Sequence, residues 1–289
     1  MRESLGERIF SGVNITILTL IGLISLFPFY YVVIVSFADP DVFLKRSFIL
    51  FPESWSLDAY KYILSTNTFI KAVGVSGYLA IVGTLLSLMV SAAFGYMLSR
   101  KRLFGRKLLM IALLITILFN PGIIPNYLVI KELNLINTLW SIILPGLLSG
   151  WNALLLKTFF DGIPESLEES AYIDGANDLR IFFQIILPLS LPALAAFGLF
   201  FAVGYWNTFF NAILYISDSS KFPLQVLLQG MLVQSNTSIG EAGGLGEEIV
   251  PPETIKMAAV VIATVPILLV YPFLQKHFAK GVMLGSVKG

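Results

Sequence analysis

Long apolar stretches alternate with short polar segments along most of the chain. A helix needs about 20 predominantly apolar residues to cross the hydrocarbon core of a bilayer. Six stretches reach that length, and the sequence therefore predicts an all-α membrane protein with six transmembrane helices. The predicted spans cover residues 11–37, 69–98, 108–130, 138–160, 189–216 and 257–275.

The third of these stretches carries signals that interrupt a helix. Asn120-Pro121-Gly122 and Pro125 fall where a continuous helix would lie in mid-membrane. Proline removes a backbone donor and its ring clashes with the preceding turn, so we expect this span to be broken. A break is tolerated in a membrane where neighbouring helices satisfy the freed carbonyl groups.

The composition agrees with a membrane protein and excludes several classes of function. The chain is 56% hydrophobic and 13% charged, whereas a typical soluble domain has about 25% charged residues. Its net charge of +1 gives no electrostatic case for binding nucleic acid. With no cysteine and one histidine, disulfides, thiolate metal sites and histidine clusters are excluded. No phosphate-binding G-x-x-x-x-G-K-[ST] motif is present.

The distribution of positive charge predicts the orientation. Lysine and arginine in short loops favour the cytoplasmic side. Five of them lie between Arg100 and Lys107, in the segment that joins the second and third spans. If that segment is cytoplasmic, so are residues 1–10, the loop 161–188 and the tail 276–289. Both termini are then cytoplasmic, and residues 1–289 are expected to form a single transmembrane domain.

The loop 161–188 predicts two short helices joined by a turn of small residues. Pro164 suits the first turn of a helix, where its missing N–H would lack a partner anyway. Gly175 is expected to end that helix in a left-handed conformation. Asn177 or Asp178 can cap the second helix. The apolar face of that second helix, which can return to the membrane, comprises Ile181, Phe182, Ile185 and Ile186.

The same loop is acidic, which is unusual for a cytoplasmic loop. We expect its acidic face to meet basic groups on a partner protein. The six acids are Asp161, Glu165, Glu168, Glu169, Asp174 and Asp178, against Lys157 and Arg180.

A spaced motif lies within this loop. Glu169-Ser170-Ala171 is followed after three residues by Gly175, and after nine more by Ile185-Ile186-Leu187-Pro188. This pattern resembles the cytoplasmic coupling loop of ABC importer membrane subunits, in which alanine is usual where Ser170 stands. Four further segments resemble the carbohydrate-uptake branch of these subunits, the maltose-type permeases. Within that branch the similarity is to permeases for complex oligosaccharides. The segments are Tyr172–Ala176, Leu187–Leu194, Trp206–Ala212 and Gly281–Gly289.

The resemblance implies a type I ABC importer permease fold in the bacterial cytoplasmic membrane. It implies a homologous second permease subunit, a cytosolic ATPase dimer that holds ATP and Mg²⁺, an extracytoplasmic solute-binding protein, surrounding lipid and a carbohydrate substrate. This chain would then be a non-catalytic pore subunit that binds no cofactor. The residues implied in ATPase coupling are Leu167, Glu169, Ser170, Ala171, Tyr172, Asp174 and Gly175.

Polar and aromatic residues inside the spans are candidates for the substrate pathway. Polar residues in membrane helices usually face the interior of the bundle. On a continuous fifth span, Asn207 and Asn211 would lie one turn apart, as would Trp206 and Phe210. Interhelical hydrogen bonds or positions in an interfacial aromatic belt are the alternative roles. The candidates are Trp206, Asn207, Phe210 and Asn211, with Asn120 and Tyr127 in the broken third span.

The sequence disfavours two other classes of function. An ion-coupled secondary sugar transporter usually places charged residues within its spans, whereas here Lys71 and Lys157 lie near span ends. Clear inverted repeats are also missing from the sequence. An intramembrane enzyme would need paired aspartates or an H-E-x-x-H motif, and neither occurs.

Overall fold

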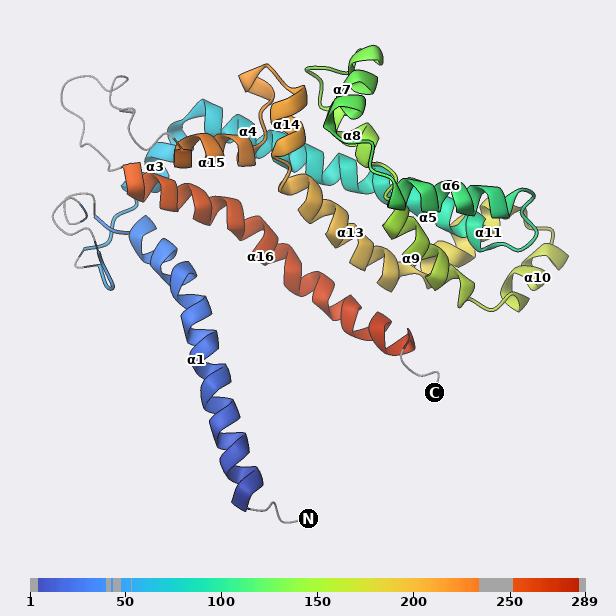
Figure 1. The fold of residues 1–289 in the computed structure, drawn as a ribbon, viewed down its shortest axis with the longest axis horizontal. Helices are drawn as coiled ribbons and strands as arrows, with labels where there is room; N and C mark the ends of the chain where they lie inside the picture. The colour runs from blue at the N-terminus through green and yellow to red at the C-terminus, as the bar shows by residue number, and fades with distance from the viewer. Residues whose placement is uncertain (1–4, 40–42, 44–47, 53, 234–251, 286–289) are drawn as a thin grey trace. The chain divides into compact units, whose positions relative to one another are not determined.

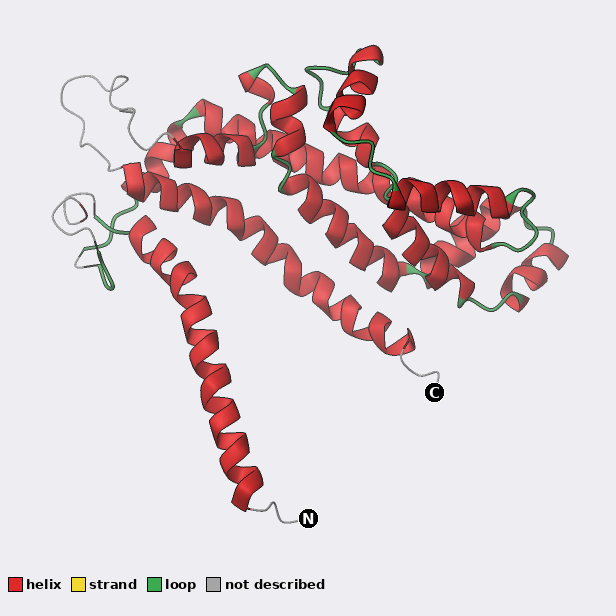
Figure 2. Cartoon of the chain, viewed as in Figure 1, coloured by secondary structure: helices red, strands yellow, loops and turns green. Residues whose placement is uncertain are grey.

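The computed structural model describes residues 5–39, 43, 48–52, 54–233 and 252–285 as helices joined by turns and loops (Figure 2). The chain divides into two compact units, Met1–Asn67 with Leu228–Val265 and Thr68–Leu227 with Pro266–Gly289. The coupling and pathway candidates all lie in the second unit. Residues Gly240–Gly246 and the end of the predicted cytoplasmic tail lie outside the described residues.

Three helical stretches are long and apolar enough to cross a membrane by themselves. They are Ile9–Ser36 in α1 (Leu5–Ser36), Asn67–Ser99, and Glu253–Val270 in α16 (Pro252–Gly285). Three bent pairs of helices bring the number to six if each pair is one span. The described residues therefore confirm an all-helical membrane protein with three to six spans.

In the first unit, the end of α1 is joined to α3 (Asp58–Ser65) by polar and aromatic contacts. The hydroxyl groups of Ser36 and Tyr60 lie 2.7 Å apart, and the rings of Phe37 and Tyr60 lie 4.8 Å apart. Helix α15 (Leu224–Val233) begins in the second unit and ends in the first, because the boundary between the units falls between Leu227 and Leu228. The Gly-rich run Gly240–Gly246 and Pro251-Pro252 predict an irregular segment over residues 217–256. Its apolar part folds as helix α15, which corrects that prediction.

The longest span of the second unit comprises α4 (Asn67–Tyr78), the π-helical turn η1 (Leu79–Gly83) and α5 (Thr84–Ser99). Helix α5 packs against α9 (Gly150–Asp161) and α13 (Leu191–Trp206) (Figure 1). Their contact is the centre of a core that includes Leu79, Leu156, Phe160 and Phe197. This core holds residues of the loop 161–188, described below, against the membrane helices.

The predicted break in the third span is confirmed. Helices α6 (Arg106–Leu118) and α7 (Ile123–Glu132) meet at 119°. Gly122 has a φ of +85° at the bend, a conformation that glycine adopts without steric cost. Its N–H donates to Asn120 Oδ1 at 3.0 Å, so Asn120 stabilises the break itself.

The fourth span is bent by 44° between α8 (Trp140–Gly146) and α9. Carbonyl groups at such a break lack helical partners, and neighbouring hydroxyl groups supply them. Ser87 Oγ donates to the Gly146 carbonyl at 3.2 Å, Ser91 Oγ to the Leu147 carbonyl at 3.3 Å, and the Tyr205 hydroxyl to the Ile143 carbonyl at 3.2 Å.

The prediction of a continuous fifth helix over 189–216 was wrong. Helix α13 begins at an 83° bend after residues 178–189 and ends at Trp206, and α14 (Phe210–Tyr215) is a separate helix. The Asn207 N–H donates the last hydrogen bond of α13 to the Val203 carbonyl. Its side-chain Oδ1 accepts a hydrogen bond from Gln225 Nε2 at 3.0 Å. This tertiary hydrogen bond and the non-helical backbone of Phe209 outweigh the unbroken apolar pattern.

Candidate functional site

The loop 161–188 folds as two short helices joined by a tight turn. Helix α10 covers Ser166–Ile173 and α11 covers Asp178–Ile181. Gly175 between them has a φ of +77°, which confirms the predicted left-handed turn. Asn177 Oδ1 accepts from the Arg180 N–H at 2.8 Å, which confirms the predicted cap. Pro164 lies before the helix rather than in its first turn, because Glu165 is the residue that precedes α10.

After α11 the chain returns to the membrane helices through the π-helical turn η2 (Phe182–Ile186) and α12 (Leu187–Leu189). Ile181 and Ile186 are fully buried and Phe182 is 5% exposed. The predicted apolar face of the second helix therefore packs into the core of the second unit. This packing fixes one end of the loop, because large apolar side chains lose favourable burial if it moves.

Most of the acids in the loop pair with cations of this same chain. Lys101 Nζ lies 2.8 Å from Glu165 Oε1, and Lys157 Nζ lies 2.5 Å from Asp161 Oδ2. Two further ion pairs join Arg100 to Glu168 and Arg102 to Asp178. The expectation that the acidic face as a whole meets a basic partner is thereby corrected. Among the described residues, Glu169 and Asp174 are the two loop acids without such a pair.

Arg100 forms the most buried of these pairs. Its Nη1 lies 2.5 Å from Glu168 Oε1, and the two side chains are 11% and 7% exposed. Its Nη2 donates to the Phe160 carbonyl at 3.1 Å, and its Nε donates to Ser99 Oγ at 2.9 Å. The guanidinium also lies 4.8 Å from the centre of the Tyr96 ring. Sequence reasoning missed this arginine, since its partners lie far away along the chain.

Arg102, Tyr172 and Asp178 form a second, more exposed cluster. The Arg102 guanidinium donates to the Tyr172 hydroxyl and to Asp178, and lies 4.5 Å from the Tyr172 ring centre. Partial burial, followed by the hydrogen bond to Asp178, raises the pKa of the Tyr172 hydroxyl. In the neighbouring exposed pair, the hydrogen bond from Lys101 lowers the pKa of Glu165. At neutral pH the Tyr172 hydroxyl is therefore neutral, and the Glu165 carboxylate stays ionised for its pair with Lys101.

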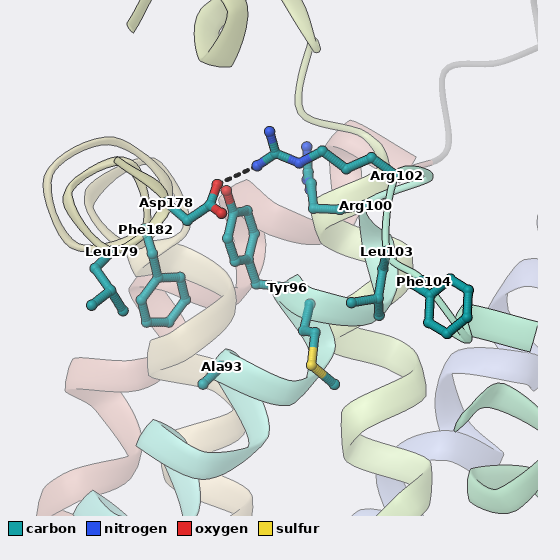
Figure 3. A pocket seen from close by; sticks show the side chains of 10 residues that line it. Ala93, Tyr96, Arg100, Arg102, Leu103, Phe104, Asp178, Leu179 and Phe182 are labelled. Carbon is teal, nitrogen blue, oxygen red and sulfur yellow. Dashed lines mark hydrogen bonds and ion pairs between the residues drawn. The ribbon is translucent and has the colours of Figure 1, made fainter. Parts of the chain in front are cut away.

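A cavity of about 520 Å³ lies beside this cluster, between the end of α5 and the start of α11. Figure 3 shows the ion pair of Arg102 and Asp178 at its edge, with Tyr96 and Phe182 forming its wall. Phe104 at the rim is 99% exposed and Leu179 is 68% exposed. The segment 100–107 and the loop 161–188 thus lie together at one end of the second unit.

The predicted coupling residues do not all face outward. Ala171 and Tyr172 pack against the core of the second unit, so they support the loop from within. The most exposed apolar side chain of α10 is Ile173, at 86%, which sequence reasoning did not single out. Its signal was a large apolar residue within a polar loop. The exposed members of the predicted set are Leu167, Glu169, Ser170, Asp174 and Gly175.

The structure brings together part of the predicted pathway group. Tyr127 of α7 stacks on Tyr215 of α14 with ring centres 6.3 Å apart, so these two helices are neighbours. Phe210 and Asn211 are exposed at the start of α14. Asn207 and Asn211 do not share one helix face, since α13 and α14 are separate. The other two candidates have structural contacts instead. Trp206 is buried at the end of α13, and Asn120 stabilises the α6–α7 bend through its hydrogen bond.

Comparison with known proteins defines the class. Residues 89–284 match the family model described as binding-protein-dependent transport system inner membrane component. This range is more than half of the chain, so the chain belongs to that family. It is an ABC importer permease, the non-catalytic subunit in the bacterial inner membrane.

Individual relatives match along the whole length. The chain is 50% identical over 284 residues to the polygalacturonan/rhamnogalacturonan transport system permease protein YtcP of Bacillus subtilis (strain 168), covering 98% of this chain and 99% of YtcP. It is 45% identical to Protein LplC of the same bacterium, covering 100% and 98%. A chain in the crystal structure of a bacterial ABC transporter involved in importing the acidic polysaccharide alginate has a TM-score of 0.91 at 30% identity, covering 96% and 99%.

Proposed function

We propose that this chain forms one half of the pore of an ATP-driven oligosaccharide importer, with six spans and both termini in the cytoplasm. The main support is the meeting of the basic segment 100–107 with the loop 161–188, because the positive charge favours the cytoplasm for both. In this proposal the α6–α7 pair and the α8–α9 pair are each one span, and α13 lies in the fifth span. Residues 1–289 then form one permease domain, with residues 1–10 and 276–289 as cytoplasmic ends.

The proposed importer contains three kinds of partner. A homologous second permease completes the pore, a cytosolic ATPase dimer binds ATP and Mg²⁺, and an extracytoplasmic solute-binding protein delivers the substrate. The family description, which specifies binding-protein dependence, supports the last of these. Alternating access follows from the different affinities of the ligands for the two pore conformations.

We propose that the ATPase docks on the exposed side of α10 and the following turn. Five of the predicted coupling residues are exposed there, and Ile173 adds a large apolar side chain that docking would bury. Glu169 and Asp174 have no intramolecular ion pair among the described residues, so their charge is available to basic groups of the ATPase. Ala171 and Tyr172 would act by supporting this surface.

The proposed substrate is an oligosaccharide derived from a plant-type or acidic polysaccharide. YtcP is named for polygalacturonan and rhamnogalacturonan, and the similar solved transporter is described as importing alginate. Within the pore we assign substrate contacts to residues near α7 and α14, where aromatic and amide groups occur together. The full set is Tyr127, Phe210, Asn211, Asn207, Trp206 and Asn120.

The proposal is tested with the assembled importer in proteoliposomes. Uptake of labelled oligogalacturonide should require the binding protein and hydrolysable ATP, and should stop with a non-hydrolysable ATP analogue. An imposed proton or sodium gradient without ATP is the control. Uptake driven by such a gradient alone would replace this proposal with the ion-coupled carrier.

A further inference from the structure

We infer that Arg100 is a positioning residue that makes α10 and the cytoplasmic end of α5 move as one body, through its buried ion pair with Glu168. The inference rests on the proposed function, since α10 has a motion to transmit only if an ATPase drives it. It assigns the transmission of force to one buried pair, and not to the exposed pairs that surround it.

The first support is the way in which α10 is attached. Throughout Ser166–Ile173, all of which the structure describes, the one buried side chain is Glu168. No large apolar side chain of α10 is buried, and Ala171 and Tyr172 contribute partly buried contacts. The Glu168 carboxylate is therefore the one buried attachment of this helix to the membrane helices. A buried carboxylate is favourable only while its charge is compensated, so this attachment depends on its cation.

The second support is the number of elements that Arg100 joins. It stands where α5 ends, and its guanidinium contacts Glu168 of α10 at 2.5 Å and the Phe160 carbonyl of α9 at 3.1 Å. Its Nε is held by Ser99, and its flat face lies on Tyr96 (Figure 3 shows Tyr96 and Arg100 together). A planar guanidinium held on several sides has little freedom to rotate. Displacement of α10 is therefore passed directly to α5 and α9.

The neighbouring ion pairs lack this property. The side chains of Lys101 and Glu165 are 78% and 62% exposed, and those of Arg102 and Asp178 are 52% and 68% exposed. Water and salt screen the attraction in such exposed pairs, and their long side chains can change rotamer freely. They can hold the loop loosely near the segment 100–107, but they do not form a rigid connection. Lys101 therefore provides a matched control from the adjacent position.

The test uses the complete importer with its binding protein in proteoliposomes. It compares Glu168→Gln and Arg100→Lys with Lys101→Gln, and the readout is oligosaccharide imported per ATP hydrolysed in equal amounts of assembled complex. Loss of an energetic coupling lowers this ratio by about fivefold or more. We expect that loss for the first two variants and a ratio close to wild type for Lys101→Gln. A purely structural role would lower the yield of complex and leave the ratio unchanged, which would overturn the inference.

If the single variants assemble poorly, a covalent crosslink in place of the ion pair between Arg100 and Glu168 still tests the inference. The chain has no native cysteine, so Arg100→Cys with Glu168→Cys can be joined by a short bis-methanethiosulfonate crosslinker, which forms a reducible disulfide with each thiol and releases sulfinate. Crosslinking should restore the ratio and reduction should abolish it again. Failure of the crosslinked complex to recover would reject the inference. Failure of the wild-type complex to import with ATP would instead reject the proposed function.

Discussion

Gly175 is unusual among the small residues of the loop 161–188 because its backbone conformation favours glycine. Its φ is +77°, and a β-carbon built there meets no atom of the described residues within 4 Å. The left-handed conformation costs a residue with a β-carbon about 1–2 kcal/mol. The space outside the turn is open, so any further penalty for a side chain must come from a docked partner.

Gly105 allows these two penalties to be separated. It has a φ of +73° in the adjacent basic segment, and a β-carbon there also meets no atom within 4 Å. We expect Gly175→Val to reduce co-purification of the ATPase much more than Gly105→Val, although both carry similar backbone strain. The amount of ATPase retained per permease after detergent extraction measures the difference. Equal losses in the two variants would mean that Gly175 acts through backbone strain and not through docking.

The structure of the loop 161–188 could be predicted at residue level because its signals are local. Gly175 as a left-handed turn and Asn177 as a cap follow from rules that act over a few residues. The ion pair of Arg100 and Glu168 depends on contact between distant segments, for which a single sequence gives no register. For the same reason, the acids appeared free to meet a partner, whereas the fold pairs most of them with the segment 100–102 and Lys157.

At the scale of helices, breaks could be predicted where the chain carries Pro and Gly, and not where tertiary contacts cause them. The α6–α7 bend follows from Pro121 and Gly122. No proline or glycine follows Trp206 at the end of α13 until Pro223, and this end depends on the contact of Asn207 with Gln225. The pathway residues were therefore assigned to one helix face that does not exist.

The packing of α13 against η1 gives a prediction at this scale. The buried Tyr205 ring lies where a β-carbon on Gly83 would approach it to 2.7 Å, and its hydroxyl is 2.9 Å from Ser87 Oγ. Gly83→Ala should therefore destabilise the subunit by about 1–3 kcal/mol through overpacking. Gly77→Ala in α4, where the added carbon meets nothing within 4 Å, is the control. Thermal unfolding of the purified protein in detergent measures both, and equal stability would show that the ring moves freely aside.

At the scale of the whole molecule, the function depends on which side of the membrane each loop faces. The proposed orientation places α10 in the cytoplasm, within reach of an ATPase, and places the segment after α14 on the outer side, within reach of a binding protein. The basic segment 100–107 supports this orientation through its charge and through its ion pairs to the loop 161–188. The two ends of the second unit can be tested independently, since no cysteine of the chain interferes.

Ser166 at the start of α10 and Ser220 after α14 are both exposed, so each can carry a single reporter cysteine. A membrane-impermeant maleimide added to intact protoplasts should label Ser220→Cys and leave Ser166→Cys unlabelled until the membrane is permeabilised. The cysteine-free chain is the control for background labelling. The reverse pattern would place the coupling loop outside the cell, where no ATPase could reach it. Labelling of both positions in intact protoplasts would mean that the chain between them does not cross the membrane an odd number of times, which would exclude the proposed fifth span.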